Sequence, residues 1–285
     1  MEFPYLSNWY VEDEEIQKFK DATYREFVKL CKNEDGIIEM NSLLNSEWML
    51  RTYCASKMIM AATLLLNSAE YSIEKNLLIT EAIWTRYMPS RKMIQDIVES
   101  GVIGEVTSLT ANLSYAVTEK ERIRKPELAG GALLDVGVYP INFASMVLGE
   151  NLKDVQSSAI FEGGVDILET IIMNFEGNKM ATLQSGVREI SDRMGSIFGT
   201  KGYIQVQNIN NPEKIAVFNQ NHEETASYFP PKQITGYEYE VRACKKALEE
   251  GKIECPEMPH AETVRIMEIM DGLRKSWGYE IPEVE

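Results

Sequence analysis

The spacing of hydrophobic and polar residues changes about a third of the way along the chain. Residues 12–32 place their apolar side chains on one stripe at helical spacing, which predicts an amphipathic helix. Residues 41–76 predict one or two more helices, whose most apolar part is the run 58–66. Residues 77–80 (Leu-Leu-Ile-Thr) predict a short buried strand. The part of the chain before residue 81 is therefore predicted to be mainly helical.

From about residue 90 onward, short apolar stretches separated by turn residues become the dominant pattern. Strands are predicted at 106–115, 155–161, 168–175, 180–185, 194–198, 203–206 and 214–218. Helices are predicted at 90–100, 138–148, 236–250 and 260–277, the last two ending at glycines. Most connections between strands are too short for a parallel crossover, so neighbouring strands are predicted to run antiparallel. The predicted fold class is α+β, a large mostly antiparallel sheet with helices on one face.

This change of pattern divides the chain into two predicted domains, a mainly helical segment at 1–80 and an α+β domain at 81–285. Glycine follows the same division, because only Gly36 of the 18 glycines lies before residue 101. Phosphate-binding loops depend on glycine, which reaches positive φ at little energetic cost. The chain contains neither G-x-G-x-x-G nor G-x-x-x-x-G-K-[ST], so it is predicted to lack a glycine-rich nucleotide loop.

The charge balance narrows the classes of partner. The 285 residues include 29 basic and 44 acidic side chains, which gives a formal net charge of −15. Such a chain repels phosphate backbones and anionic lipid headgroups, so neither nucleic acid nor a membrane surface is predicted as a partner. The longest apolar run, 58–66, is about half of the ~18 residues that a membrane span needs.

The N-terminus and the cysteines predict a cytoplasmic protein. A secretory signal needs a basic start and an apolar stretch, whereas residues 12–15 here are acidic. The four cysteines are Cys31, Cys54, Cys244 and Cys255, and no two of them form a C-x-x-C pair. We therefore expect reduced thiols and no metal site.

The strongest candidate for chemistry lies in GGALLDVGVYP, residues 130–140. Asp135 and Tyr139 are four residues apart at a predicted helix start, which places both side chains on one face. A tyrosine hydroxyl can donate a proton to a carbonyl oxygen, or accept one from an alcohol, when a neighbouring charge tunes its pKa. A carboxylate alone raises the pKa of a phenol, so a cation must also lie nearby. The alternative interpretation is structural: Asp135 caps the helix and Tyr139 packs in the core.

A second candidate group follows the predicted strand at 77–80. Trp84 and Arg86 lie where a strand end meets a loop, which is a common place for ligand contacts. The alternative is that Trp84 fills a gap in the core and Arg86 pairs with a surface acid. The two histidines are weaker candidates, because His222 lies in a polar stretch and His260 at a helix start. A histidine-based triad is therefore not predicted.

Four ordered motifs resemble the Gfo/Idh/MocA oxidoreductases, and among them the dimeric dihydrodiol dehydrogenase-like branch. The motifs are EAIWTRYMP at 81–89, SGVIGEV at 100–106, GGALLDVGVYP at 130–140 and FGTKG at 198–202. The resemblance covers about 77–285 and implies an NAD(P)-dependent dehydrogenase that acts on a diol, a sugar or a similar polyol.

The resemblance also implies roles for particular residues. Tyr139 would be the general acid or base, Asp135 would support it, and the segment with Trp84 and Arg86 would border the nicotinamide. Proteins of this kind commonly form dimers through the large sheet, so a homodimer or a higher homo-oligomer is expected.

The first third of the chain departs from the family pattern. The family begins with a Rossmann domain and carries a Glu-Lys-Pro motif whose lysine supports catalysis, and neither is intact here. Lys57, in Cys-Ala-Ser-Lys at 54–57, lies near the expected distance before Glu81 and is the candidate counterpart of that lysine. The prediction is a truncated or degenerate Rossmann domain with impaired binding of NADP or NAD.

Three interpretations of function remain open from the sequence. The first is an oxidoreductase of the family, the second a non-catalytic binding or assembly protein that uses the sheet, and the third a fragment of a full-length dehydrogenase. The missing glycine loop favours the second, whereas the Asp135 and Tyr139 pair favours the first.

Overall fold

The computed structural model describes residues 69–70, 72–74 and 76–279. The described helices are η1 (Trp84–Arg86), α5 (Pro89–Glu99), α6 (Glu121–Arg124), η2 (Pro126–Leu128), η3 (Leu133–Gly137), α7 (Val138–Leu148), α8 (Glu238–Glu249) and α9 (His260–Trp277). The strands are β1 (Val106–Ser114), β2 (Leu152–Glu162), β3 (Val165–Phe175), β4 (Lys179–Gly186), β5 (Gly195–Gly199), β6 (Gly202–Gln207), β7 (Lys214–Asn219) and β8 (Glu224–Tyr228). The helix predicted at 12–32, and most of the helical stretch at 41–76, lie outside the described residues. The domain boundary at residue 80 stays a prediction.

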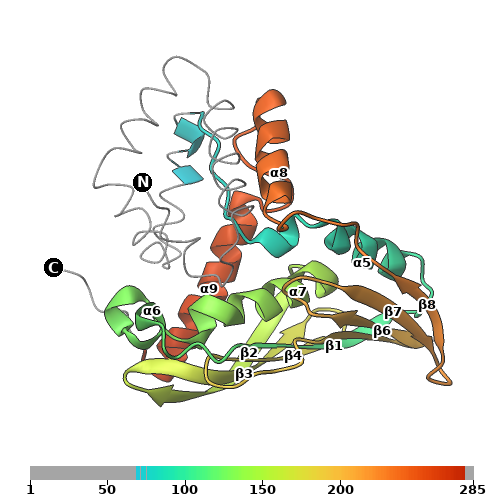
Figure 1. The fold of residues 1–285 in the computed structure, drawn as a ribbon, viewed down its shortest axis with the longest axis horizontal. Coiled ribbons are helices and arrows are strands. Elements are labelled where there is room, and N and C mark those ends of the chain that lie inside the picture. Colours follow the sequence, from blue (N-terminus) through green and yellow to red (C-terminus); the bar gives the residue numbers. More distant parts are fainter. Residues whose placement is uncertain (1–68, 71, 75, 280–285) are drawn as a thin grey trace.

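The strands form one sheet in the order β2-β3-β4-β1-β5-β6-β7-β8. All neighbouring pairs run antiparallel except β1 and β4, which run parallel. Figure 1 shows the helices gathered on one side of this sheet. The predicted α+β class, with a mostly antiparallel sheet and helices on one face, is confirmed.

The core lies between the helices and the sheet. Along β4, Ala181 and Leu183 are buried while Met180 and Thr182 are exposed, so the strand alternates between a helix side and an open side. Most of α7 is buried, and the helix packs on β1 and β4. Each fully buried aliphatic side chain in such a layer contributes roughly 1.5–3 kcal/mol of transfer free energy.

The open side of the sheet carries a continuous row of uncharged residues. Consecutive strand pairings connect one residue from each strand across the whole sheet. In sheet order the row is Gln156, Ile172, Thr182, Thr110, Ser196, Gln205, Ala216 and Ser227. None of these eight residues is charged, although 26% of the residues in the chain are. Depletion of charge is typical of the centre of a protein interface.

Two details of the predicted fold are wrong. Residues 77–80 form no strand, because their backbone does not pair with another strand: Ile79 N bonds to Ile253 O (3.0 Å) and Ile79 O bonds to the His260 ring (2.9 Å). Leu77 is also 40% exposed. The strand β8 is absent from the prediction, because its exposed positions carry polar residues that lack an alternating apolar pattern.

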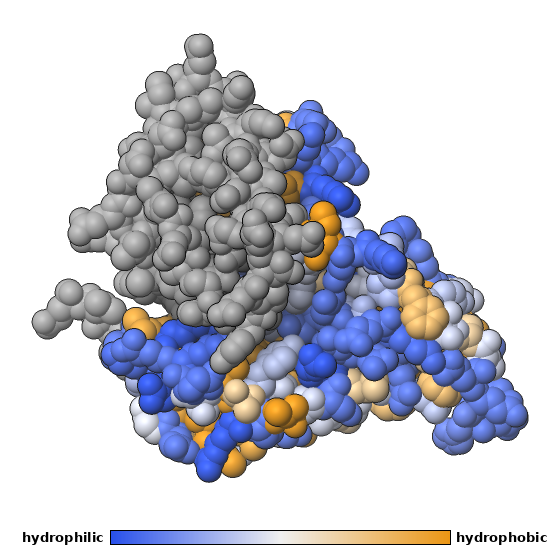
Figure 2. Space-filling view, in the orientation of Figure 1, coloured by the Kyte–Doolittle hydropathy of each residue, from blue (hydrophilic) through white to orange (hydrophobic). Residues whose placement is uncertain are grey.

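The segment Pro126–Leu148 is long and apolar enough to cross a membrane, but 78% of its most apolar window is buried in the described structure. It is therefore a core segment by its packing. Figure 2 shows the described surface on the viewed side as mainly hydrophilic, with hydrophobic residues in small separate groups.

Candidate functional site

Asp135 and Tyr139 lie on either side of the junction between η3 and α7. η3 is a single turn of π-helix, and such turns are frequent at functional sites. The N-cap of α7 is Gly137, so Asp135 does not occupy the capping position that the structural alternative assigned to it. Asp135 instead forms an ion pair with Arg122 of α6, and both side chains are more than three quarters buried. The cation that the sequence argument required beside the carboxylate is thus present.

The hydroxyl of Tyr139 lies in a protected environment. Burial raises the pKa of Tyr139 above its ordinary value, and the negative charge of Asp135 raises it further. A hydrogen bond involving Trp84 lowers the same pKa, but by less. Tyr139 therefore holds its proton at neutral pH and is suited to donate it to a developing alkoxide.

Trp84 also begins a chain of side-chain hydrogen bonds that leads away from Tyr139 to two other parts of the fold. The indole Nε1 of Trp84 donates to Asn210 Oδ1 (3.1 Å), and Asn210 Nδ2 donates to the hydroxyl of Tyr115 (3.2 Å). Tyr115 directly follows β1, and Asn210 lies between β6 and β7. The structure thus brings Trp84 next to Tyr139, as a shared site requires. Asn210 and Tyr115 are missing from the sequence prediction, because no local motif marks them.

Two residues at the start of α8, Tyr237 and Glu240, lie near Trp84 and Tyr139 respectively. The ring of Tyr237 stacks on Trp84 with centroids 4.9 Å apart. Burial raises the pKa of Glu240 to about 8, with a further rise from Cys255. Glu240 also raises the pKa of Tyr139. Small-molecule sites commonly combine aromatic side chains with a few hydroxyl, amide and carboxyl groups.

Arg86 lies in a different environment from Trp84. Its guanidinium is buried and pairs with Glu262 of α9. It also donates to Asn142 Oδ1 and to Ser145 Oγ (3.3 Å) on α7. Arg86 therefore ties η1 to α7 and α9, and it pairs with a buried acid rather than a surface one. Its contact with a cofactor stays a prediction.

The remaining predicted site residue, Lys57, lies outside the described residues. Within the part of the chain that the structure describes, no group of three or more histidine, cysteine or acidic residues is placed to hold a metal ion.

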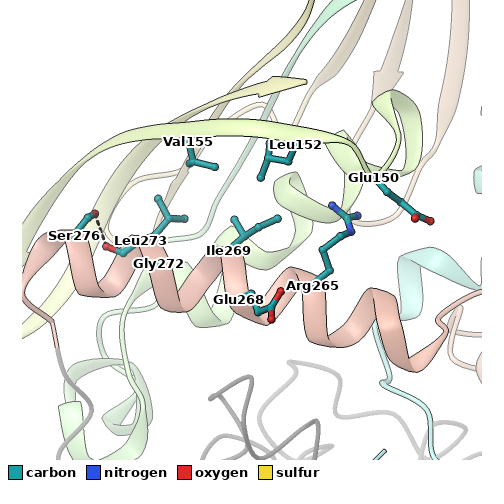
Figure 3. Close-up of a pocket in the computed structure, with 9 residues that line it drawn as sticks. All are labelled: Glu150, Leu152, Val155, Arg265, Glu268, Ile269, Gly272, Leu273 and Ser276. Atoms are coloured by element: carbon teal, nitrogen blue, oxygen red, sulfur yellow. Dashed lines mark hydrogen bonds between the residues drawn. The ribbon is translucent and has the colours of Figure 1, made fainter. Parts of the chain in front are cut away.

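A groove of about 490 Å³ runs between β2 and α9 (Figure 3). Figure 3 shows Leu152 and Val155 of β2 pointing toward Ile269 and Leu273 of α9. At its polar end, Arg265 is already bound to Glu262 of the same helix (2.6 Å). Because the groove is mainly aliphatic and contains none of the predicted site residues, we place the candidate chemistry at Tyr139 instead.

Residues 92–205 match the GFO/IDH/MocA C-terminal domain. This range includes Asp135 and Tyr139 and most of the sheet. These residues therefore form a Gfo/Idh/MocA C-terminal domain. The family that the four sequence motifs indicated is therefore confirmed.

Curated proteins similar to this chain include trans-1,2-dihydrobenzene-1,2-diol dehydrogenases. The Mus musculus protein is 27% identical over 217 residues, which cover 72% of this chain and 63% of that protein. The Xenopus laevis protein is 31% identical over 217 residues, which cover 73% of this chain and 65% of that protein. The Gfo/Idh/MocA chain thus spans less than two thirds of the length of these relatives.

Solved structures share the fold. KijD10, a 3-ketoreductase from Actinomadura kijaniata in complex with NADP and TDP-benzene, has a TM-score of 0.69 and 21% identity, covering 76% of this chain and 67% of that one. An aldose-aldose oxidoreductase from Caulobacter crescentus, complexed with glycerol, has a TM-score of 0.67 and 15% identity, with the same coverage. At these identities the likeness establishes the fold of the Gfo/Idh/MocA domain.

Proposed function

We propose that this Gfo/Idh/MocA chain provides the substrate-binding and proton-transfer groups of an NAD(P)-dependent oxidoreductase for diols, sugars or similar polyols. The observation that supports this most directly is the arrangement around Tyr139. Its hydroxyl lies in a protected position beside Trp84, and the nearby carboxylate of Asp135 is paired with Arg122. The curated relatives that share this domain are dihydrodiol dehydrogenases, which favours the same substrate class.

Oxidation of a secondary alcohol to a ketone removes a proton from the oxygen and a hydride from the carbon. In the proposed reaction Tyr139 exchanges the proton with the substrate oxygen. In the direction of reduction, the raised pKa of Tyr139 keeps the proton in place until negative charge develops on that oxygen. In the direction of oxidation, the charge of Arg122 offsets Asp135 and so limits the repulsion that a phenolate would meet.

A nicotinamide cofactor would take up or supply the hydride. The described residues do not fit its phosphates: of the two predicted cofactor residues, Trp84 and Arg86, only Arg86 carries a charge, and its guanidinium is bound to Glu262, Asn142 and Ser145. The whole sequence also lacks a glycine-rich phosphate loop. We therefore assign no step to the cofactor and propose that its affinity is strongly reduced in this chain.

Two measurements test this proposal. The first follows the absorbance of reduced nicotinamide while the chain is incubated with NADP or NAD and a panel of trans-dihydrodiols and aldoses. Turnover of one of them supports the proposal, and turnover of none with either cofactor contradicts it. The second is a fluorescence titration with NADPH and NADH, in which micromolar affinity for either contradicts the reduced cofactor binding.

We also propose that the chain forms a homodimer through the open side of its sheet. The uncharged row supports this, and so does an aromatic group on the same side, in which Tyr203 stacks on Phe218 with centroids 4.7 Å apart. The same observation favours the second candidate function, an assembly protein without catalysis. Sedimentation separates a dimer from a monomer, and the turnover assay separates an enzyme from an assembly protein.

A further inference from the structure

Two acidic side chains are buried in the middle of the Gfo/Idh/MocA domain. Asp166 is 0% and Glu169 is 1% exposed, and both belong to β3. Residues three apart on a regular strand point to opposite faces of the sheet. Here the register shifts, because Phe161 pairs with Asp166 while Ile160 pairs with Leu168. The extra residue of this β-bulge lets both carboxyls reach the helix side, as bulges near functional sites often do.

Both carboxyls contact the η3 turn that precedes Tyr139. Asp166 Oδ2 accepts a hydrogen bond from the backbone N of Leu133 (2.6 Å), the first residue of η3. Asp166 also leaves no room for a side chain at Gly131, whose φ is 104°. At the other end of the turn, a Cβ on Gly137 would meet Glu169 Oε1 at 2.5 Å. The two glycines on either side of the turn thus each lie against one carboxyl.

The two carboxyls also interact with each other. Burial raises the pKa of Glu169 well above its ordinary value, the negative charge of Asp166 adds to this, and a hydrogen bond from Ser185 opposes it. Burial also raises the pKa of Asp166, while backbone N–H groups, that of Leu133 foremost, lower it. Ionising both carboxyls would bring two negative charges together away from water, so the pair favours one proton, held on Glu169.

The hydrogen bonding around the two carboxyls is consistent with one proton shared between Asp166 and Glu169. Asp166 Oδ1 and Glu169 Oε2 are buried, and neither has another hydrogen-bond partner among the described residues. A proton on Glu169 directed at Asp166 gives these oxygens a partner. Two further titratable groups face the pair: Glu189 adds negative charge near Glu169, and Tyr279 lies near Asp166. Glu189 favours the protonated form of the pair, whereas Tyr279 is uncharged at neutral pH and donates its proton to Gly130 O (3.1 Å).

We propose that Asp166 and Glu169 are positioning residues that hold the η3 turn, and with it Asp135 and Tyr139, in the geometry for proton transfer. Their hydrogen bonds and packing fix both ends of a turn whose π-helical backbone has no cap of its own from a side chain. The proposal rests on the proposed function in one respect, the role of Tyr139. The position of the turn itself is measurable without turnover.

The experiment compares Glu169→Gln with Glu169→Ala in the full chain, with Glu176→Gln as an exposed control. A glutamine reproduces a neutral carboxyl, because it can donate to Asp166 and accept from Ser185. Amide hydrogen exchange is measured for the peptides covering residues 131–139, and the infrared band of protonated carboxylic acids is recorded at neutral pH. Where turnover exists, kcat and KM are measured as well.

We expect Glu169→Gln to keep wild-type exchange at 131–139 and kcat within about twofold. We expect Glu169→Ala to exchange at least about tenfold faster there and to lose about tenfold in kcat with little change in KM. The infrared band should weaken in Glu169→Gln and stay unchanged in Glu176→Gln. If Glu169→Ala does not fold, Ser185→Ala takes its place, and it should also speed exchange at 131–139.

The proposal is overturned if the alanine variants exchange no faster at 131–139 than Glu176→Gln does. It is equally overturned if Glu169→Gln behaves like Glu169→Ala, or if the infrared band does not depend on Glu169. These outcomes are independent of turnover. A wild-type chain without activity contradicts the proposed function, while the exchange and infrared data still decide the role of the acid pair.

Discussion

Arg122 and Asp135 form an ion pair that joins α6 to the η3 turn, at the point where the chain turns toward Tyr139. Neither residue is fully exposed, so solvent screens their attraction only partly. The pair gives the site both an acid and a cation next to a tyrosine. It also makes the position of Asp135 depend on a residue from another helix.

The attraction between Arg122 and Asp135 should be measurable as a coupling free energy in a double-mutant cycle. We expect Arg122→Gln and Asp135→Asn each to lower the free energy of unfolding, with a coupling of about 1 kcal/mol in the double-mutant cycle. Urea unfolding of the four proteins at low salt gives this value. Strictly additive effects would show that the two side chains do not stabilise each other.

Tyr139→Phe should lower kcat by about 100-fold or more, because it removes the hydroxyl that exchanges the proton and leaves the ring in place. The melting temperature should change little. Tyr228→Phe, at an exposed position of β8, is the matched control and should keep full activity. Unchanged turnover in Tyr139→Phe rules out the acid or base role of Tyr139.

Glu262→Gln should lower the free energy of unfolding by about 3 kcal/mol at neutral pH, because it leaves the buried charge of Arg86 without its carboxylate. Burial alone raises the pKa of Glu262, but Arg86, Ser145 and Arg265 together lower it below its ordinary value. The stabilisation is therefore complete above the ordinary glutamate pKa of about 4.3 and is lost as the pH falls through the lower folded-state value.

Urea unfolding between neutral and acidic pH checks this prediction. The Glu262→Gln variant should lose less stability than the wild type as the pH falls below about 4. Glu268→Gln, at an exposed position on the same helix α9, is the control and should follow the wild type. Equal acid sensitivity of wild type and Glu262→Gln would show that the pair contributes no pH dependence.

Glu169 should have the opposite pH signature. Its folded-state pKa is raised, so the folded chain keeps a proton that the unfolded chain has lost once the pH exceeds about 4.3. The wild type should therefore lose stability as the pH rises from there toward the folded-state value, and Glu169→Gln should lose less. Burial likewise raises the pKa of Glu81 to about 7, and Glu81 affects both proteins equally, so it cancels in their difference. Parallel pH profiles of the two proteins would contradict a protonated Glu169.

Thr182→Lys should convert a dimer into a monomer. Thr182 lies near the middle of the uncharged row, and a lysine there would bring two like charges into the proposed interface. Asn221→Lys makes the same change in charge on the exposed turn between β7 and β8 and should leave the dimer intact. Sedimentation equilibrium measures both, and a wild-type protein that stays monomeric at high concentration contradicts the interface.

Element positions could be predicted well wherever local sequence decides them. The helix 138–148 is predicted with its observed bounds, because Gly149 takes a positive φ of 93° and ends the apolar stretch there. The helix 260–277 ends in the same way at Gly278, whose φ is 69°. The parallel pairing of β1 with β4 could not be predicted, because those strands are separated by two others along the chain. Short loops indicate only which consecutive strands are neighbours.

The site could be predicted only in part. Asp135 and Tyr139 share one local motif, so their juxtaposition follows from spacing. Arg122 lies 13 residues before Asp135, and no periodicity connects them. Asn210 reaches Trp84 from a loop 126 positions away, which only tertiary structure reveals. Contacts between residues so far apart in the sequence form only when the whole domain folds, so the sequence pattern does not reveal them.

The bulge in β3 determines how this strand would respond to the loss of one residue. Ile167 has no partner on β2, because Phe161 pairs with Asp166 and Ile160 with Leu168, so a chain lacking Ile167 could pair the two strands in a regular ladder. In that shorter strand Asp166 and Glu169 would stand two positions apart and would still point to the same face, because successive side chains of a strand alternate. A deletion at this point would therefore remove the bend and the extra twist that a bulge gives a strand, while both acids would stay on the side of η3.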